Sequence, residues 1–281
     1  LHTLAAEMGP LGAKFSNDVL LDAKLFKRVK AVYDKRGSLT LTPEQKTLLE
    51  DTYKGFVRGG ANLSKKKKAR LREISERLSP LTPAFMQNTV KSAEAFELVI
   101  SDKKDLSGLP DSAIDSAAHA AEEKGYTGKW LFTLDYPSFG PFLQYADNRE
   151  LREKIWRAFG SRAWKGEYDN SAIILETVKL KKERAKLLGY KTHAHYVLEE
   201  RMAKSPEQVM EFLKKLKTAY KPAAKKDLAT LKKYAAKEHG LTELMPWDVG
   251  YYAEKLRKKL FDFTSEDFRP YYSLEKVLKG C

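Results

Sequence analysis

The chain has 281 residues, of which 42% are hydrophobic and 32% are charged, a composition that excludes a disordered chain and permits one or two packed domains. Its net charge is +14, and residues 151–281 carry most of the excess, with 29 basic and 18 acidic groups. The lone cysteine, Cys281, excludes an intrachain disulfide and a cysteine-based metal site and indicates a reducing compartment, so we expect a cytoplasmic protein and an incidental thiol.

No membrane partner is expected, because no apolar run approaches the length that a bilayer crossing needs. The first residues also lack the basic start and apolar stretch of a signal peptide.

The first ninety residues predict three helices. Ser16 is placed to cap a helix that runs to about Arg36. Residues 42–45, Thr-Pro-Glu-Gln, form a capping box with proline at the first helical position and open a second helix that ends at Gly59. Ser64 begins a third helix.

Two prolines lie inside the third helical pattern. Pro80 and Pro83 each remove a backbone donor and crowd the preceding turn, so we expect a kink or a break there.

The middle of the chain predicts a small β element near residues 96–145. Its apolar and aromatic runs are typical of strands, and they flank an alanine-rich helix. The expected strands are 96–100, 130–134 and 142–145, and the helix runs from 111 to 124.

Helices resume after this element and continue to the end of the chain. Asn148 precedes an amphipathic helix, and either Asp169 or Asn170 caps the next one, which stops at Gly189. A second capping box with proline opens a long helix to His239, kinked near Pro222. The expected shorter helices are 248–259 and 273–278. The sequence therefore predicts a mainly α fold, with a 1–125 region containing the first strand and a 126–281 region containing the second strand pair.

Little in the sequence supports a metal site or a catalytic motif. His193 and His195 are the one close histidine pair, and on a helix two residues so spaced point to different sides, whereas an extended segment would let them share an ion. Packing or capping is the favoured role. There is no H-E-x-x-H, G-x-S-x-G or P-loop, so we assign no catalytic and no metal-binding residue.

The positive charge does not by itself indicate a nucleic-acid partner. The run 65–68, four lysines, opens a helical pattern without the interleaved aromatic residues of a single-strand binder, and no nucleic-acid-binding motif is present. A solvated lysine-rich helical surface is the favoured interpretation.

An aromatic group follows Pro246. Tyr251 and Tyr252 follow Trp247 and Asp248 one helical turn later, and Asp248 is placed as a helix cap. The tyrosines either contact a ligand or pack with Trp247.

Several stretches resemble the thimet-oligopeptidase and peptidyl-dipeptidase (Dcp) family of zinc metallopeptidases. Their order and spacing match the family along nearly the whole chain. The stretches are LFKRVKAVYDKR (25–36), LLEDTYKGFVRGGANLS (48–64), AFELVISD (95–102), NRELREKIWRAF (148–159), DNSAIILETVKLKKERAKLLGYKTHAHYVLEERMAKSPEQVMEFL (169–213), MPWDVGYYAEKLR (245–257) and FRPYYSLEKVLKG (268–280).

The resemblance implies a multi-helical, neurolysin-like scaffold that forms one half of a channel-containing peptidase. In this family a zinc ion is held by H-E-x-x-H and a downstream glutamate, and the substrates are short peptides, which peptidyl-dipeptidases shorten by C-terminal dipeptides. The zinc helix follows the region matched by 268–280, so we expect this chain to bind no zinc, to be inactive by itself and to lack its catalytic half.

The resemblance also suggests where a substrate channel would pass. The segment with Trp247, Asp248, Tyr251 and Tyr252 is the candidate channel or groove wall. Because a packing partner would be missing, we expect exposed apolar surface and self-association. The alternative function is a catalytically inactive helical module that binds peptides or a partner.

Overall fold

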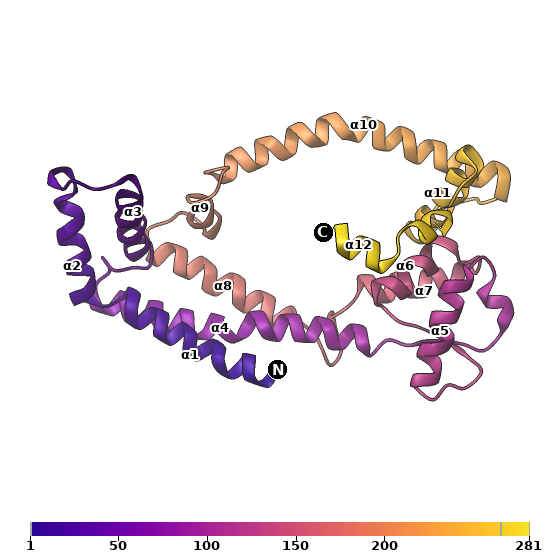
Figure 1. The fold of residues 1–281 in the computed structure, drawn as a ribbon, viewed down its shortest axis with the longest axis horizontal. Helices are drawn as coiled ribbons and strands as arrows, with labels where there is room; N and C mark the ends of the chain where they lie inside the picture. The colour runs from indigo at the N-terminus through magenta and orange to yellow at the C-terminus, as the bar shows by residue number, and fades with distance from the viewer. Residues whose placement is uncertain (1, 265, 281) are drawn as a thin grey trace. The chain divides into compact units, whose positions relative to one another are not determined.

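The structure is a computed structural model that describes residues 2–264 and 266–280, with the side chains of all of these except 2, 3, 5, 6 and 269. Cys281, expected to be an incidental thiol, lies outside the described residues. The described part holds twelve α-helices and one two-stranded sheet, which confirms the mainly α class (Figure 1). No helix in it has an apolar stretch that would suit a bilayer crossing.

The chain forms two compact units, each built from two separate stretches. One unit contains the residues up to Asn88 and Lys165–Leu213, and the other contains Thr89–Trp164 and the residues from Lys214 onward. The division into 1–125 and 126–281 stays a prediction, although a cut there would separate two strands that pair with each other.

The first unit is entirely helical. Its elements are α1 His2–Leu20, α2 Ala23–Asp34, the 3-10 helix η1 Arg36–Ser38, α3 Pro43–Arg58, the first part of α4 Lys65–Glu94, α8 Ser171–Leu187, α9 His193–Leu198 and the start of α10 Pro206–His239.

The N-terminal helix differs from the prediction. A single helix from Ser16 to Arg36 was wrong, because α1 ends at Leu20 and α2 begins after Asp22. The Asp22 carboxylate accepts a hydrogen bond from the backbone nitrogen of Leu25 at 2.7 Å, which makes it the cap that divides the pattern. The capping box of Thr42 is confirmed.

The predicted break in the third helix is absent. Helix α4 runs through Pro80 and Pro83, although an interior proline costs about 3 kcal/mol. Leu81, between the two prolines, is buried with Leu180 of α8. Two ion pairs also join α4 to α8, Arg70 with Glu183 and Arg77 with Glu176. These contacts hold α4 along α8 and offset the cost of the prolines.

The structure shows which of the two candidate residues supplies the capping bond at the start of α8. Asn170 occupies the cap position, but its side chain donates to the carbonyl of Phe85 in α4 instead. Asp169 accepts from the backbone nitrogen of Ser171 at 2.9 Å and supplies the capping bond.

The second unit contains the sheet. Strand β1 Leu98–Ile100 pairs antiparallel with β2 Trp130–Phe132, and Val99 lies opposite Leu131. Its other elements are the end of α4, the 3-10 helix η2 Lys103–Leu106, α5 Asp111–Glu123, α6 Tyr136–Tyr145, α7 Arg149–Gly160, the rest of α10, α11 Pro246–Phe261, the 3-10 helix η3 Glu266–Tyr271 and α12 Leu274–Gly280.

The expected strand at 142–145 was wrong, because this segment is the end of α6. Asp135 precedes the helix and Pro137 is its second residue, a position where proline is tolerated. The apolar run of α6 packs inward as a helix, and Phe142 is completely buried with Phe132 and Ile155 in the main core.

Candidate functional site

The four candidate wall residues lie in the first turns of α11 and are buried. Trp247, Asp248, Tyr251 and Tyr252 are each less than a tenth exposed. Their spacing places them on one side of the helix, where α11 packs against α6, α7 and α10. The packing alternative for the tyrosines therefore has a structural basis, and a role in a channel wall stays a prediction.

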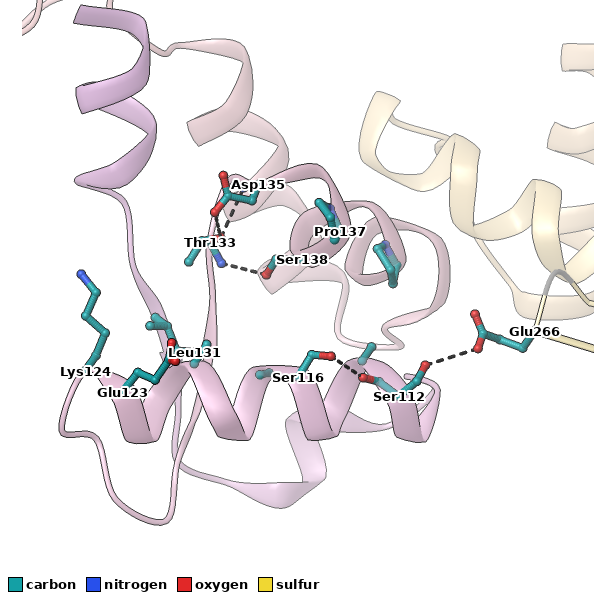
Figure 2. Close-up of a pocket in the computed structure, with 14 residues that line it drawn as sticks. Ser112, Ser116, Glu123, Lys124, Leu131, Thr133, Asp135, Pro137, Ser138 and Glu266 are labelled. Carbon is teal, nitrogen blue, oxygen red and sulfur yellow. Dashed lines mark hydrogen bonds between the residues drawn. The ribbon is translucent and has the colours of Figure 1, made fainter. Parts of the chain in front are cut away.

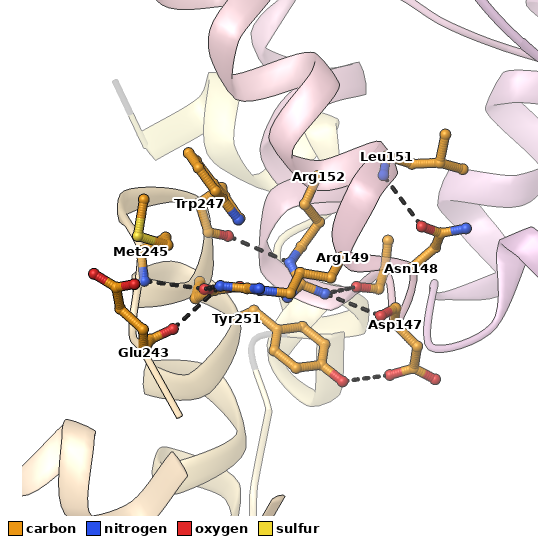
Figure 3. Close-up of polar contacts among 11 residues, drawn as sticks. Asp147, Asn148, Arg149, Leu151, Arg152, Glu243, Met245, Trp247 and Tyr251 are labelled. Atoms are coloured by element: carbon orange, nitrogen blue, oxygen red, sulfur yellow. Dashed lines mark hydrogen bonds and ion pairs between the residues drawn. The ribbon is translucent and has the colours of Figure 1, made fainter. Parts of the chain in front are cut away.

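Asp248 is the centre of a buried ion cluster. Figure 3 shows its two arginine partners, Arg149 and Arg152, beside the start of α11. Arg149 donates to both carboxylate oxygens, with Nε to Oδ1 at 3.0 Å and Nη2 to Oδ2 at 2.7 Å. Arg152 donates from Nη2 to Oδ1 at 2.9 Å. Asp248 does not occupy the cap position predicted for it, which is held by Met245. It is the third helical residue, and its Oδ2 accepts a hydrogen bond from the backbone nitrogen of Met245 at 3.0 Å.

Arg152 joins three elements through one side chain. It is only 1% exposed and donates to the carbonyl oxygens of Ala146 at 2.7 Å, Asp147 at 3.1 Å and Trp247 at 3.3 Å. Its guanidinium also lies 3.9 Å from the centre of the Tyr251 ring. Arg152 thus fixes α7 to α11 and to the end of α6.

A second carboxylate lies beside this cluster. The Tyr251 hydroxyl and the Ser107 hydroxyl each donate to Asp147 at 2.6 Å, and Lys255 is 3.4 Å from it. Gly108 brings its loop close, since a Cβ there would lie 2.3 Å from the carbonyl oxygen of Tyr145.

Hydrogen bonding fixes the charge state of both carboxylates. Burial raises the pKa of Asp248, but the bonds from Arg149, Met245 and Arg152 outweigh it, so its pKa lies below the ordinary value. The same balance, with Ser107 and Tyr251 as donors, lowers the pKa of Asp147. Burial and the bond to Asp147 raise the pKa of Tyr251.

These charge states limit the chemistry of the cluster. A general acid or base at neutral pH needs a pKa near 7, and a metal ligand needs free lone pairs. The carboxylates are ionised and already bound to arginine, hydroxyl and backbone donors, so the cluster fits a role in holding helices together.

Tyr251 also lines a pocket of about 400 Å³ between α6 and α11. Buried Glu254 contributes its carboxylate, which accepts from Gln144 at 2.9 Å and from Arg257 at 2.6 Å. Lys255 and Lys258 on the same pocket balance the charges of Glu254 and Glu266.

A larger pocket of about 440 Å³ lies between α5, β2 and the start of α6 (Figure 2). Its hydroxyl groups bond to the backbone and to carboxylates: Ser116 donates to the carbonyl of Ser112 at 2.8 Å, and Thr133 donates to the carboxylate of Asp135 at 3.0 Å. The lining contains no histidine. Small residues dispersed over α5 and α6 form this pocket, and no sequence motif marks it.

The histidine pair lies on α9. Thr192 caps this helix, and its hydroxyl is 2.7 Å from Nδ1 of His195. His193 and His195, two positions apart on a helix, point to different sides. Within residues 2–264 and 266–280, no three histidine, cysteine or acidic residues are grouped so that they could hold a metal ion.

Comparison with known proteins identifies relatives of this chain. The sequence profile of Peptidase family M3 matches residues 142–281. Oligopeptidase A of Haemophilus influenzae is 37% identical over 96% of this chain, and dipeptidyl carboxypeptidase of Escherichia coli is 34% identical over 95%. A probable cytosolic oligopeptidase A of Arabidopsis thaliana is 37% identical over 99%.

The chain is related to the M3 peptidases by sequence. It spans about 40% of the length of these curated relatives. The part that matches the M3 profile contains Arg149, Arg152 and Asp248, so the buried ion cluster lies within it. The resemblance stated from sequence motifs is thereby confirmed.

Proposed function

We propose that this chain is the helical part of a zinc oligopeptidase that acts on short peptides, and that the whole protein releases dipeptides from their C-terminal ends. The observation that carries this proposal is a similarity of 34–37% identity, along at least 95% of the chain, to proteins named oligopeptidase A and dipeptidyl carboxypeptidase. The chain spans 40% of the length of oligopeptidase A, which supports the proposal that it is part of an enzyme rather than a complete one.

The proposed contribution of this chain is structure and access. The ion cluster of Asp248 with Arg149 and Arg152 joins α7 to α11, and a wall that excludes large substrates must be rigid in this way. Tyr251, which contacts Arg152 of this cluster, also lines a pocket. The segment with Trp247, Asp248, Tyr251 and Tyr252 is therefore proposed to support the channel wall.

The zinc of the M3 family does not fit the residues described here. Three-residue ligand groups are absent from the described residues, and the sequence has no H-E-x-x-H. We therefore propose that the metal and the catalytic groups belong to residues other than those of this chain, which is inactive alone. A cytoplasmic location is proposed with it, on the strength of the single cysteine.

The test begins with the reading frame of the parent gene downstream of the codon for Cys281. The proposal expects an H-E-x-x-H there, and its absence would favour the inactive binding module instead. The whole protein and the 281-residue chain are then incubated with an N-terminally blocked peptide, and products are identified by mass spectrometry.

We expect dipeptide release by the whole protein, loss of release with a chelator, and none with the 281-residue chain. A whole-protein variant with the motif glutamate changed to glutamine is the matched control and should be inactive. Zinc-dependent release by the purified chain would overturn the division of roles proposed here.

A further inference from the structure

His193 is the first residue of α9, the short helix that packs on α8 in the first unit. Its Nδ1 atom reaches neither solvent nor a hydrogen-bond partner among the described residues. The imidazole is stacked on the Tyr196 ring, with 6.2 Å between the ring centres. Both ring nitrogens carry a proton in the cationic form, so protonation would bury an N–H donor that has no acceptor.

The charged groups that act on His193 from α8 are cations. They are Arg184 and Lys181, and burial together with these two charges holds the pKa of His193 below its ordinary value. Arg184 forms no ion pair in the described part of the chain, and its Nε is buried without a partner. Its guanidinium lies 5.6 Å from the centre of the Tyr196 ring, on which the imidazole is also stacked.

The carboxylates on and beside α9 have other partners. The ion pairs are Arg58 of α3 with Glu199, Lys54 of α3 with Glu200, and His195 with Glu207 of α10. Arg58 also donates to the carbonyl oxygen of Tyr196 at 2.7 Å. Among the described residues, no carboxylate forms an ion pair with His193, so a positive charge on its ring would have no counter-ion.

We propose that His193 is a proton-sensitive switch, which keeps α9 packed on α8 while its imidazole is neutral and releases α9 when the imidazole takes up a proton. Protonation places a cation beside Arg184 and Lys181 and leaves a buried N–H unpaired, and α9 avoids both costs by leaving α8. Because Arg58 binds α9 through Glu199, release of α9 also loosens its contact with α3.

The direction of the effect follows from the pKa of the histidine in each state. Released α9 binds a proton at the ordinary histidine pKa of about 6.5, whereas packed α9 binds it only at lower pH. The packing of α9 is therefore strongest above that value and weakens as pH falls toward the folded pKa. A difference of one pKa unit changes the opening equilibrium constant about tenfold.

The test is amide hydrogen exchange of the 281-residue chain at about pH 7.5 and about pH 5. Exchange rates are divided by the intrinsic rate at each pH, so that protection factors are compared. The protection of residues 193–198 should fall about tenfold at the lower pH. The protection of α4 around Ile74, which is buried in the core of the same unit, should stay the same.

Three variants assign the effect to this histidine. His193→Phe keeps a ring and removes the titration, so protection of α9 should be equal at the two pH values. Arg184→Met removes one of the two cations and should make the fall smaller, because the burial of Nδ1 remains. His119→Gln, at an exposed position on α5, is the matched control and should keep the full wild-type fall.

The proposal is overturned if protection of α9 in the wild-type chain is equal at the two pH values, or if the fall persists in His193→Phe. A fall that extends equally to the residues around Ile74 would overturn it as well, because the whole unit would then be unfolding. Urea unfolding shows whether each variant is folded. If His193→Phe is not, Arg184→Met decides, and a fall as large as in the wild-type chain rejects the switch.

Discussion

At the scale of single residues, the second unit depends on a carboxylate that solvent does not reach. Asp248 is fully buried and forms ion pairs with Arg149 and Arg152, and Arg152 is itself 1% exposed. Removing one partner of a buried ion pair leaves an uncompensated charge in a medium of low polarity.

Asp248→Asn should therefore destabilise the chain by about 3–5 kcal/mol, because Arg152 keeps its charge and loses its counter-ion. The change would be measured as the free energy of unfolding in urea. Asp227→Asn, at an exposed position on α10, is the control and should change little. Equal effects of the two substitutions would contradict the assigned role of the cluster.

The same carboxylate predicts a pH dependence. The pKa of Asp248 is lower in the folded chain than its ordinary value of about 3.9. Its contribution to stability is therefore complete above that value and is lost as pH falls through the folded pKa. Between pH 5 and pH 2 the wild-type chain should lose more stability than Asp248→Asn does. An identical loss in both would assign acid sensitivity to other groups.

At the scale of elements, contacts decide how long a helix continues. Helix α4 passes Pro80 and Pro83 because Leu81 is buried against α8 and arginines on both sides of Ile74 pair with α8 glutamates. The local cost of each proline remains in the folded state and is outweighed by packing.

Pro80→Ala should therefore stabilise the chain by about 1–2 kcal/mol. The free energy gained from the restored backbone hydrogen bond exceeds the free-energy cost of the greater conformational entropy of the unfolded chain. Urea unfolding measures the change. Pro43→Ala is the control, because proline is favoured at the first position of α3 and its loss should give no gain. A neutral or destabilising Pro80→Ala would mean that the proline fits α4 without cost.

At the scale of the whole molecule, the two units are built from alternating stretches of sequence. Helices α4 and α10 each begin in the first unit and end in the second, since the divisions fall at Asn88 and Leu213. Each unit has buried clusters of its own, around Ile74 and Phe26 in the first and around Phe142 and Tyr251 in the second.

Neither unit offers a metal site within the described residues, and this gives a prediction for the chain. Excess zinc should leave its thermal unfolding midpoint unchanged, because a ligand raises the midpoint only by binding the folded state. Differential scanning calorimetry with and without a chelator makes the comparison. A zinc-dependent rise that disappears in His193→Ala would reveal a site on α9.

Much of the fold could be predicted from local sequence, because the signals are local. Thr42 and Gln45 form their capping box within four residues, and Asn148 caps α7 through Leu151. Where the prediction was wrong, another contact outweighed the local signal. Asp22 caps α2 in the middle of the stretch that was predicted as one helix, and packing in the main core makes residues 142–145 helical.

The candidate site, too, could be predicted only in part from the sequence. The sequence marked Trp247, Asp248, Tyr251 and Tyr252 as a group, since one helix carries them within two turns. It gave no sign that Arg149 and Arg152, about a hundred residues earlier, would meet Asp248. Buried ion pairs between distant helices depend on how those helices pack, which residue spacing does not encode.

The sequence by itself determined the helical class, most helix ends and the relationship to the M3 peptidases, because caps, periodicity and family motifs are read along the chain. The tertiary structure alone decided that the predicted wall residues are buried and that α4 continues past its prolines. Each of these depends on which surfaces of distant segments exclude water from one another, and that is a property of the packed molecule.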